Sequence, residues 1–184
     1  MALVKANANL ANLAFSGNSA TLSGGGLYTN FSNANVVNCS FTNNLALVGG
    51  GGMACELTRS PFVRNTIFWQ NLVPNAPANA QEILYELKPL IAHSVVKGGW
   101  DDPAQPGNLA VDPMFVDPLG VDGTSGTEDD DLRLQPGSPC IDQGNDLALP
   151  ADRFDADGDG RTNTPLPVDA AGASRFTDDP ATPD

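Results

Sequence analysis

The acidic residues near the carboxyl end have the spacing of a cation-binding loop. Three carboxylates alternate with small residues and end in a glycine that permits a sharp turn, in the run Asp155-Ala-Asp157-Gly-Asp159-Gly160. This alternation places the carboxylates on one side of a tight loop, and calcium prefers such a cage of oxygen ligands. The backbone carbonyl of Arg161 and the side chain of Asn163 would fill the next two positions. The pattern therefore predicts a calcium site.

This loop differs from a helix-loop-helix calcium site. Its twelfth position, where such a site needs a bidentate glutamate, is Leu166, and no helix-forming pattern flanks it. We expect a looser single loop in which Asp169 or Asp152 completes the ligand shell. The alternative is a solvated acidic segment in a tail rich in Pro and Asp.

A second acidic loop runs from Asp122 to Asp131. Gly123 and Gly126 let the chain fold back, so that Asp122 can meet Asp129 or Asp131. Adjacent carboxylates repel one another in the absence of a cation. The loop is therefore either a second calcium site or open to solvent, and the sequence leaves both interpretations standing.

Residues for catalysis are sparse. A polysaccharide lyase needs carboxylates that hold calcium and an Arg or Lys base beside them. Glu56, Arg59 and Arg64 are close enough in sequence to share one face. Aromatic residues that could stack on sugar rings are Tyr28, Trp69 and Trp100, the last beside Asp101 and Asp102. Surface pairing and packing explain these residues equally well, so we predict no catalytic residue.

The elements that must position these loops follow from an internal repeat. A Phe-x-x-Asn phrase begins at Phe15, Phe41 and Phe68, and a Gly-Gly-Gly phrase begins at Gly24 and Gly50. The steps are 26 and 27 residues for the first phrase and 26 for the second. A fixed period in this range is typical of a solenoid, in which each repeat is one coil that buries its apolar side against its neighbours.

Short β-branched and aromatic runs indicate that the solenoid is all-β. Runs such as Thr66-Ile67-Phe68 and Ser94-Val95-Val96 are bounded by Gly, Asn and Ser, and helical periodicity is absent from residues 1–75. A coil of this length holds about three short strands and their turns. We predict a parallel β-helix of about four coils. Its periodic residues should form an internal Phe stack and an Asn ladder, with members Asn18, Asn44 and Asn71.

The chain divides into three parts. Residues 1–100 should form the coils, residues 101–150 a capping segment with the second acidic loop, and residues 151–184 an acidic tail with the calcium loop. The segment Gln81–Leu87 fits either a short helix or a strand, and the coil spacing favours the strand.

Charge is unevenly distributed. Residues 1–100 carry five Lys or Arg and three Asp or Glu, a net charge of +2, and residues 101–184 carry four and nineteen, a net charge of −15, which together give −13. An acidic half argues against nucleic acid or an anionic membrane as partner. It fits a protein in a calcium-containing extracellular medium.

Targeting and cysteine signals are few. The chain has no run of eighteen apolar residues to insert in a membrane and no basic-then-apolar start, so we expect any secretion signal to lie outside this sequence. Cys39, Cys55 and Cys140 are too few for a disulfide framework. Cys39 aligns with Thr66 as a small core residue, although a Cys39–Cys55 bridge remains an alternative.

Several phrases carry a resemblance to known bacterial proteins. The Phe-x-x-Asn and Gly-Gly-Gly-(Leu/Met) alternation resembles the repeat of chlamydial polymorphic outer-membrane proteins and related right-handed β-helix surface proteins. Later phrases are similar to the C-terminal part of "choice-of-anchor" β-helix proteins: Ile67–Asn71, Val95–Trp100, Asn108–Asp117 and Leu132–Asn145. The resemblance covers most of residues 12–180, and its sharpest part is Leu134–Asp142.

This resemblance implies a right-handed, pectate-lyase-like (pectin lyase-like) solenoid on a bacterial surface or in the medium. Those proteins usually lack a recognised active site and continue into a Val-Asp-Met-Gly-Ala-Tyr-Glu phrase and a sorting anchor. Neither is present here, so we expect a fragment, monomeric in solution. The expected function is a non-catalytic extracellular scaffold, spacer, or adhesion or passenger module, stiffened by calcium. The alternative is a β-helix that binds or cleaves polysaccharide, and the expected partner is a polysaccharide or another cell-surface component.

Overall fold

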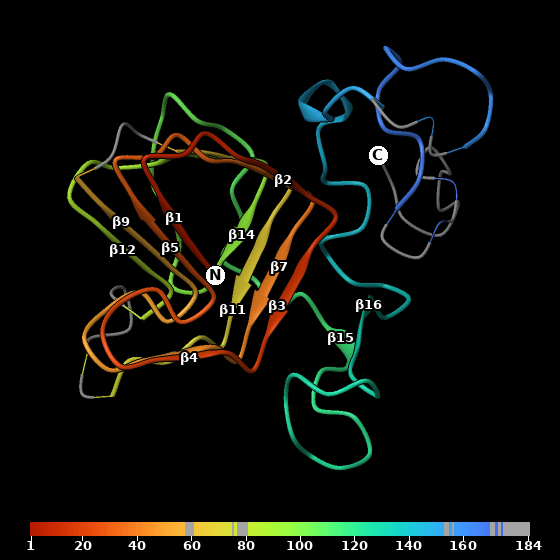
Figure 1. The fold of residues 1–184 in the computed structure, drawn as a ribbon. Helices are drawn as coiled ribbons and strands as arrows, with labels where there is room; N and C mark the ends of the chain where they lie inside the picture. Colours follow the sequence, from red (N-terminus) through yellow and green to blue (C-terminus); the bar gives the residue numbers. More distant parts are fainter. Residues whose placement is uncertain are drawn as a thin grey trace.

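Three parallel β-sheets enclose an elongated core in the computed structural model, which describes residues 1–57, 61–74, 76, 81–152, 155, 157–169, 172 and 174 (Figure 1). Sheet A consists of β1 (Ala2–Val4), β5 (Leu27–Asn30), β9 (Met53–Glu56) and β12 (Ile83–Tyr85). Sheet B consists of β2 (Asn9–Ala11), β6 (Asn35–Val37), β10 (Phe62–Arg64) and β13 (Leu90–Ala92). Sheet C consists of β3 (Ala14–Ser16), β7 (Ser40–Thr42), β11 (Ile67–Trp69) and β14 (Val95–Val96).

A short fourth side is formed by β4 (Ser19–Ala20) and β8 (Leu45–Ala46). The chain completes about three circuits between β1 and β12, and β12–β14 belong to a fourth, incomplete coil. The predicted all-β parallel solenoid is therefore confirmed, while the prediction of about four coils is slightly too high. The segment around Ile83 is a strand, as its spacing favoured.

The register places identical residues above one another. Phe15 pairs with Phe41, and Phe41 pairs with Phe68. Their ring centroids lie 4.4 and 4.7 Å apart, with interplanar angles of 4° and 9°. The rings of Phe41 and Phe68 are fully buried. The predicted internal stack is confirmed, and it forms the centre of a core that runs from Leu3 to Val96.

The predicted asparagine ladder is also confirmed. The side-chain nitrogen Nδ2 of Asn18 donates to Oδ1 of Asn44 (2.9 Å), and Nδ2 of Asn44 donates to Oδ1 of Asn71 (2.8 Å). The second amide hydrogen of Asn44 goes to the carbonyl of Phe15 (2.8 Å). The amides of Asn44 and Asn71 therefore satisfy buried backbone groups and the neighbouring amide of the ladder at once.

The glycine phrases let the chain pass close to this core. A Cβ at Gly26 would lie 2.9 Å from the ring of Phe41, and one at Gly52 would lie 3.1 Å from the ring of Phe68. Any larger residue would push on the phenylalanine stack. The Gly phrase thus leaves the space that the rings of the Phe phrase occupy.

The segment that follows β14 covers the side of the fourth coil that faces away from the third coil. The amide of Val96 donates to the carbonyl of Leu109, and the amide of Leu109 returns a bond to Ser94, at 3.0 and 2.9 Å. The indole of Trp100 packs against the core and meets the ring of Tyr85 edge-on, with centroids 5.3 Å apart. These contacts close one end of the solenoid.

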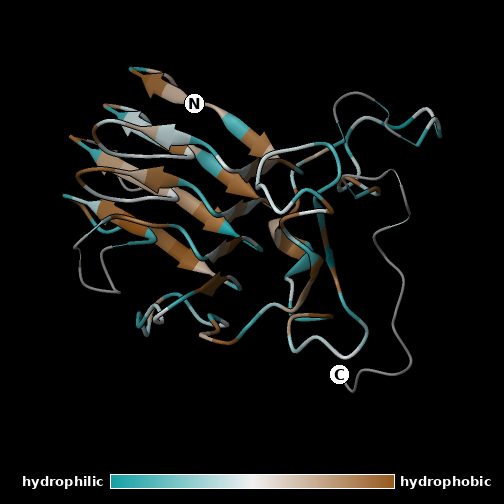
Figure 2. Cartoon of the chain, turned by 90° about the horizontal axis from the view of Figure 1, so that it is seen from below, coloured by the Kyte–Doolittle hydropathy of each residue, from teal (hydrophilic) through white to brown (hydrophobic). Residues whose placement is uncertain are grey.

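Beyond this closure the chain turns back along the outside of sheet C (Figure 1). It forms the antiparallel ribbon β15 (Phe115–Asp117) and β16 (Asp131–Leu134), and a 3-10 turn, η2 (Asp146–Ala148). In Figure 2 the apolar colouring gathers in the stacked strands and the returning segment is largely polar. No helix in the described residues is long and apolar enough to cross a membrane.

Candidate functional site

The acidic loop predicted to bind calcium lies at the tip of a small hairpin. Ala151 and Pro165 form an antiparallel bridge, and the amide of Asp152 donates to the carbonyl of Thr164 (2.8 Å). Asp155 adopts a left-handed conformation (φ 53°), which an aspartate tolerates, and so turns the chain back on itself. This backbone path brings carboxylates from the base and the tip of the loop together.

Three of these carboxylates converge. One oxygen each from Asp152, Asp155 and Asp157 lie within 4.8 Å of one another, and Asp152 is buried. Two oxygens bound to one calcium ion at about 2.4 Å each can be at most about 4.8 Å apart. The spacing and the donor type therefore fit a calcium ion, with Asp152 as one of the two residues named above to complete the shell.

The other predicted ligands of this loop have different partners. Asp159 accepts the amide of Arg161 (2.8 Å), and its carboxylate lies 4.0 Å from the guanidinium of the same residue. It is not among the carboxylates that converge in the described chain. Asn163 is exposed. The structure thus gathers the first two aspartates of the motif and leaves the third beside an arginine.

The second acidic loop connects β15 to β16, and no three of its carboxylates form a cluster that could hold an ion among the residues that the structure describes. Asp129 accepts the amides of Val121 (2.7 Å) and Asp122 (3.2 Å) and the hydroxyl of Thr127 (2.6 Å). These bonds, the one from Thr127 above all, hold the pKa of Asp129 below its ordinary value. Asp129 therefore closes its own loop, and calcium binding here stays a prediction.

Asp131 in the same loop forms an ion pair. Its carboxylate receives two guanidinium nitrogens of Arg133, and this pairing lowers the pKa of Asp131 to about 2. Both side chains lie at the surface, so the pair contributes little to stability. Its main effect is to neutralise a ligand predicted for the second ion.

Asp130, which the sequence did not single out, attaches this loop to the solenoid. One oxygen of its carboxylate accepts the hydroxyl of Ser16 in β3 (3.0 Å) and the amide of Gly126 (2.7 Å). The backbone of Ser125 also approaches Gly17 so closely that a Cβ there would lie 2.2 Å from its carbonyl oxygen. The capping segment is thus fixed to the first coil as well as to the fourth.

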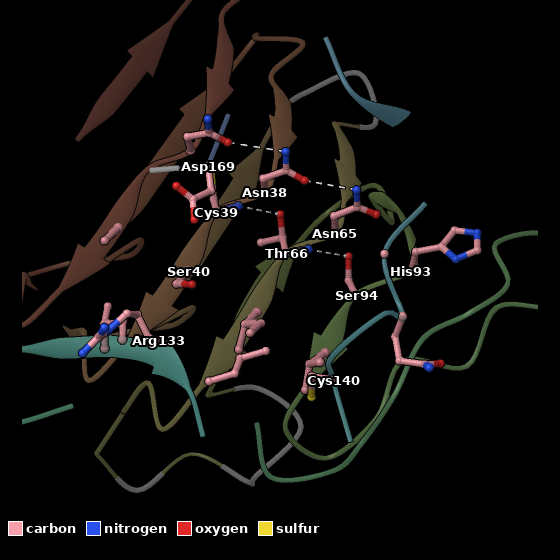
Figure 3. A pocket seen from close by; sticks show the side chains of 18 of the residues that line it. Asn38, Cys39, Ser40, Asn65, Thr66, His93, Ser94, Arg133, Cys140 and Asp169 are labelled. Atoms are coloured by element: carbon pink, nitrogen blue, oxygen red, sulfur yellow. Dashed lines mark hydrogen bonds between the residues drawn. The ribbon is translucent and has the colours of Figure 1, made fainter. Parts of the chain in front are cut away.

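A second ladder of asparagines holds the returning chain at the corner between sheets B and C. Asn65 donates to Asn38 (3.1 Å), and Asn38 donates to Asn12 (3.4 Å); all three have positive φ. Asn65 also bonds both the amide (2.9 Å) and the carbonyl (3.1 Å) of Asn145, and Figure 3 shows Asn38 and Asn65 in line along this corner. The same 26- and 27-residue steps could have revealed this ladder in the sequence.

Between sheet C and the returning chain lies a groove of about 1120 Å³ (Figure 3). Its lining carboxylates come from the returning chain: Asp130, Asp131, Asp142, Asp146 and Asp169. Its floor includes Ser40 and Ile67 of sheet C, and no Phe, Tyr or Trp of the described chain lines it. The groove is acidic, as a polysaccharide site would be, but it lacks an aromatic platform for sugar rings.

The residues considered for lyase chemistry lie apart. Glu56 belongs to β9 in sheet A, whereas Arg64 belongs to β10 in sheet B and donates to the carbonyl of Leu90 (2.9 Å). The hypothesis that Glu56 and Arg64 share a face is therefore wrong, because β9 and β10 belong to different sheets. Arg59 lies outside the described residues. Trp100 is covered by the ammonium of Lys88, 5.2 Å from its ring centre, and is no open platform.

The cysteines are free thiols. Cys39 and Cys55 are buried, and burial raises the pKa of each to about 11. Cys140 is half-buried and is also free. The alternative of a Cys39–Cys55 disulfide is not realised, and Cys39 is the small core residue expected from its alignment with Thr66, whose hydroxyl lies 3.4 Å from its amide.

Compared with protein-family models, curated protein sequences and solved structures, the chain matches none of them. The fold itself places the chain in the class of parallel β-solenoids, here with a returning acidic segment. The resemblance to polymorphic outer-membrane and choice-of-anchor proteins stays a prediction.

Proposed function

We propose that this protein is a non-catalytic extracellular scaffold, an adhesion or passenger module of a bacterial surface or secreted protein, with C-terminal loops stabilised by calcium. The observation that carries the proposal is how the repeat is used. Its phenylalanines and asparagines form a continuous buried stack and ladder. Phe41, Phe68, Asn44 and Asn71 are at most 1% exposed. Repeats used in this way build a stiff rod on which other surfaces can be displayed.

Calcium would act on the returning segment. Asp152, Asp155 and Asp157 would hold the ion through carboxylate oxygens, joining the base of the hairpin to its tip. The same hairpin continues to Val168, whose carbonyl accepts the side chain of Asn12 in the first coil (3.1 Å). An ion in this loop would therefore stiffen a segment that is already attached to the solenoid.

Thermal melting tests this part of the proposal. A ligand present at 100 times its dissociation constant stabilises a protein by about 2.7 kcal/mol, which corresponds to a rise of about 5–10 °C in Tm for a chain of this size. We expect such a rise with millimolar calcium, its reversal by chelator, and its absence in Asp155→Asn/Asp157→Asn. The matched control is Asp101→Asn, an exposed site away from the loop. An unchanged wild-type Tm would remove calcium from the proposal.

A polysaccharide-binding or polysaccharide-cleaving β-helix is the second candidate, favoured by a polar cluster on the outside of sheet A. The hydroxyl of Tyr28 donates to Glu56 (2.8 Å) and accepts from Asn30 (3.0 Å). The bond to Glu56 raises the pKa of Tyr28, to which Glu86 also adds. A tyrosine ring with two nearby carboxylates is a combination that binds sugar hydroxyls.

Incubation with polyuronides separates the two candidates. The scaffold predicts no unsaturated product by ultraviolet absorbance, with or without calcium. If unsaturated product formed at a calcium-dependent rate, and the Glu56→Gln variant lost this activity, the protein would be a lyase and the scaffold proposal would be wrong. Binding without cleavage, weakened by Tyr28→Ala and not by Tyr85→Ala, would instead identify a carbohydrate-binding module.

A further inference from the structure

One buried carboxyl has no role in the function proposed above. Glu82 is 2% exposed and lies immediately before β12, where its carbonyl accepts the amides of Gly52 (3.0 Å) and Met53 (3.1 Å). A glutamate is rarely buried to this degree in a core unless it is paired. Its side chain turns inward, whereas the side chain of Glu86, on the other end of β12, is exposed to solvent.

The carboxyl of Glu82 ends the asparagine ladder. Its Oε2 accepts both Nδ2 (2.5 Å) and the backbone amide (3.4 Å) of Asn71. In the same way Oδ1 of Asn71 accepts the side chain and the backbone amide of Asn44. The fourth coil has Gly99 one step below Asn71, so it offers no asparagine for this purpose, and Glu82 reaches in from a different side to supply the acceptor.

The ladder requires only a neutral, carbonyl-type acceptor at this point. A protonated carboxyl provides one, since its carbonyl oxygen can receive both bonds from Asn71. An ionised carboxyl adds a buried charge, and Oε1 of Glu82 has no hydrogen-bond partner among the described residues. Such a charge is costly because burial removes its hydration.

The groups around Glu82 decide how far its ionisation is offset. The turn after β11 contributes the neutral amide of Asn71 and the backbone of Gln70, and the turn before β9 contributes Gly52, which has no side chain. The segment after β14 contributes the ammonium of Lys97, which favours the charged form. Burial is nonetheless the largest influence and raises the pKa of Glu82 to about 7.

We propose that Glu82 is a pH-sensitive closure of the solenoid: the fourth coil, β12–β14, stays stacked on the third while this carboxyl is neutral and separates from it more often once the carboxyl is ionised. The sign follows from linkage. A carboxyl whose pKa is 4.5 when unfolded and about 7 when buried retains its proton longer in the closed state, so closure is strongest below pH 4.5 and weakens until pH 7. The change is tenfold per pH unit, or about 300-fold in total.

Hydrogen exchange measures this equilibrium directly. The amide of Lys97 donates to Phe68 (3.1 Å) and reports whether β14 is attached to the third coil, whereas the amide of Leu45 donates to Asn18 (2.8 Å) and reports the first two coils. We expect the protection factor of Lys97, corrected for intrinsic exchange, to fall up to about 300-fold between pH 4.5 and 8. That of Leu45 should change far less.

Two variants complete the test. Glu82→Gln keeps a neutral acceptor and should hold the protection of Lys97 constant with pH, while Glu128→Gln, at an exposed site, should behave as the wild type. A pH-independent Lys97 amide in the wild type, or equal pH dependence in Glu82→Gln, would overturn the proposal. Carbon NMR of the wild-type Glu82 carboxyl gives a measurement that needs no variant: titration near pH 7 supports the closure, and titration near pH 4.5 refutes it.

Discussion

At the scale of single residues, asparagine is the side chain that organises this protein. The side chain and the backbone amide of Asn44 take part in five hydrogen bonds: its Nδ2 donates to Phe15 and Asn71, its amide donates to Asn71, and its Oδ1 accepts two bonds from Asn18. Nearly all of these groups are buried and have no water to replace a lost partner. A carboxamide is suited to this place because it is donor and acceptor at once and carries no charge.

We expect Asn44→Ala to lower the free energy of unfolding by about 3 kcal/mol, because it leaves buried donors and acceptors without partners. The matched control is Asn18→Ala, since Asn18 is exposed at the end of the same ladder and should cost less than about 1 kcal/mol. Urea unfolding followed by circular dichroism measures both. Equal losses in the two variants would mean that burial does not set the value of the ladder.

The phenylalanines and asparagines of the core were predictable because both are periodic and their environment repeats with them. Glu82 was not predictable, because it serves the ladder from a position only 11 residues after Asn71 and outside the period. Asp130 was missed for a related reason: its partner Ser16 lies 114 residues away, and no local pattern records such a contact.

At the scale of elements, the corner between sheets B and C both bends the coil and binds the returning chain. Its asparagines adopt left-handed backbone conformations that make the bend, and their side chains hold the returning chain. The pairing of Asn65 with Asn145 imitates a β-bridge, since a side-chain amide replaces a backbone peptide group. The corner therefore couples the shape of the coil to the position of the acidic segment.

Asn65→Ala should release the returning chain near η2 with little change in the coils. We expect at least a tenfold loss of hydrogen-exchange protection at the amide of Asn145, because its acceptor is removed. Asn38→Ala is the control, because it breaks the ladder but leaves the bonds between Asn65 and Asn145 intact. If both variants released Asn145 equally, the ladder as a whole, and not Asn65, would hold the segment.

The sequence predicted the strands well and the path of the returning chain poorly. Strands such as β10 and β11 follow from β-branched and aromatic residues whose position in the coil is set by the repeat. The path after Trp100 depends on contacts to Ser16, Asn12 and Asn65, which are distant in sequence. The calcium motif was recognisable from its spacing, but only folding shows that Asp152 and not Asp159 joins Asp155 and Asp157.

At the scale of the whole molecule, residues 1–100 and residues 101–184 differ in charge and in structural role. The buried core cluster draws all its members from Leu3 to Val96, within the part of net charge +2. Among the described residues, the part of net charge −15 closes the end of the solenoid and then runs outside sheet C, where its carboxylates line the groove. Stability should therefore depend mainly on the coils, and the response to ions mainly on the returning segment.

A chain ending at residue 110 should fold on its own. It retains the whole core cluster and the closing contacts of Leu109, and it loses a few surface bonds worth about 2 kcal/mol in sum. A chain ending at residue 89 should be much less stable, because it loses β13 and β14 and leaves the end of the third coil uncovered. Denaturant unfolding compares the two. An unfolded 1–110 chain would show that the acidic segment belongs to the core.

The common register of the phenylalanine stack and the two asparagine ladders has a consequence for how this protein can change in length. All three columns advance together by 26 or 27 residues, so duplicating one repeat in the gene would extend the rod by one strand spacing, about 4.8 Å, and leave every column intact. Insertion of one or two residues within a strand would displace all three columns at once. The rod can therefore lengthen in whole steps, each of one coil, during evolution or design.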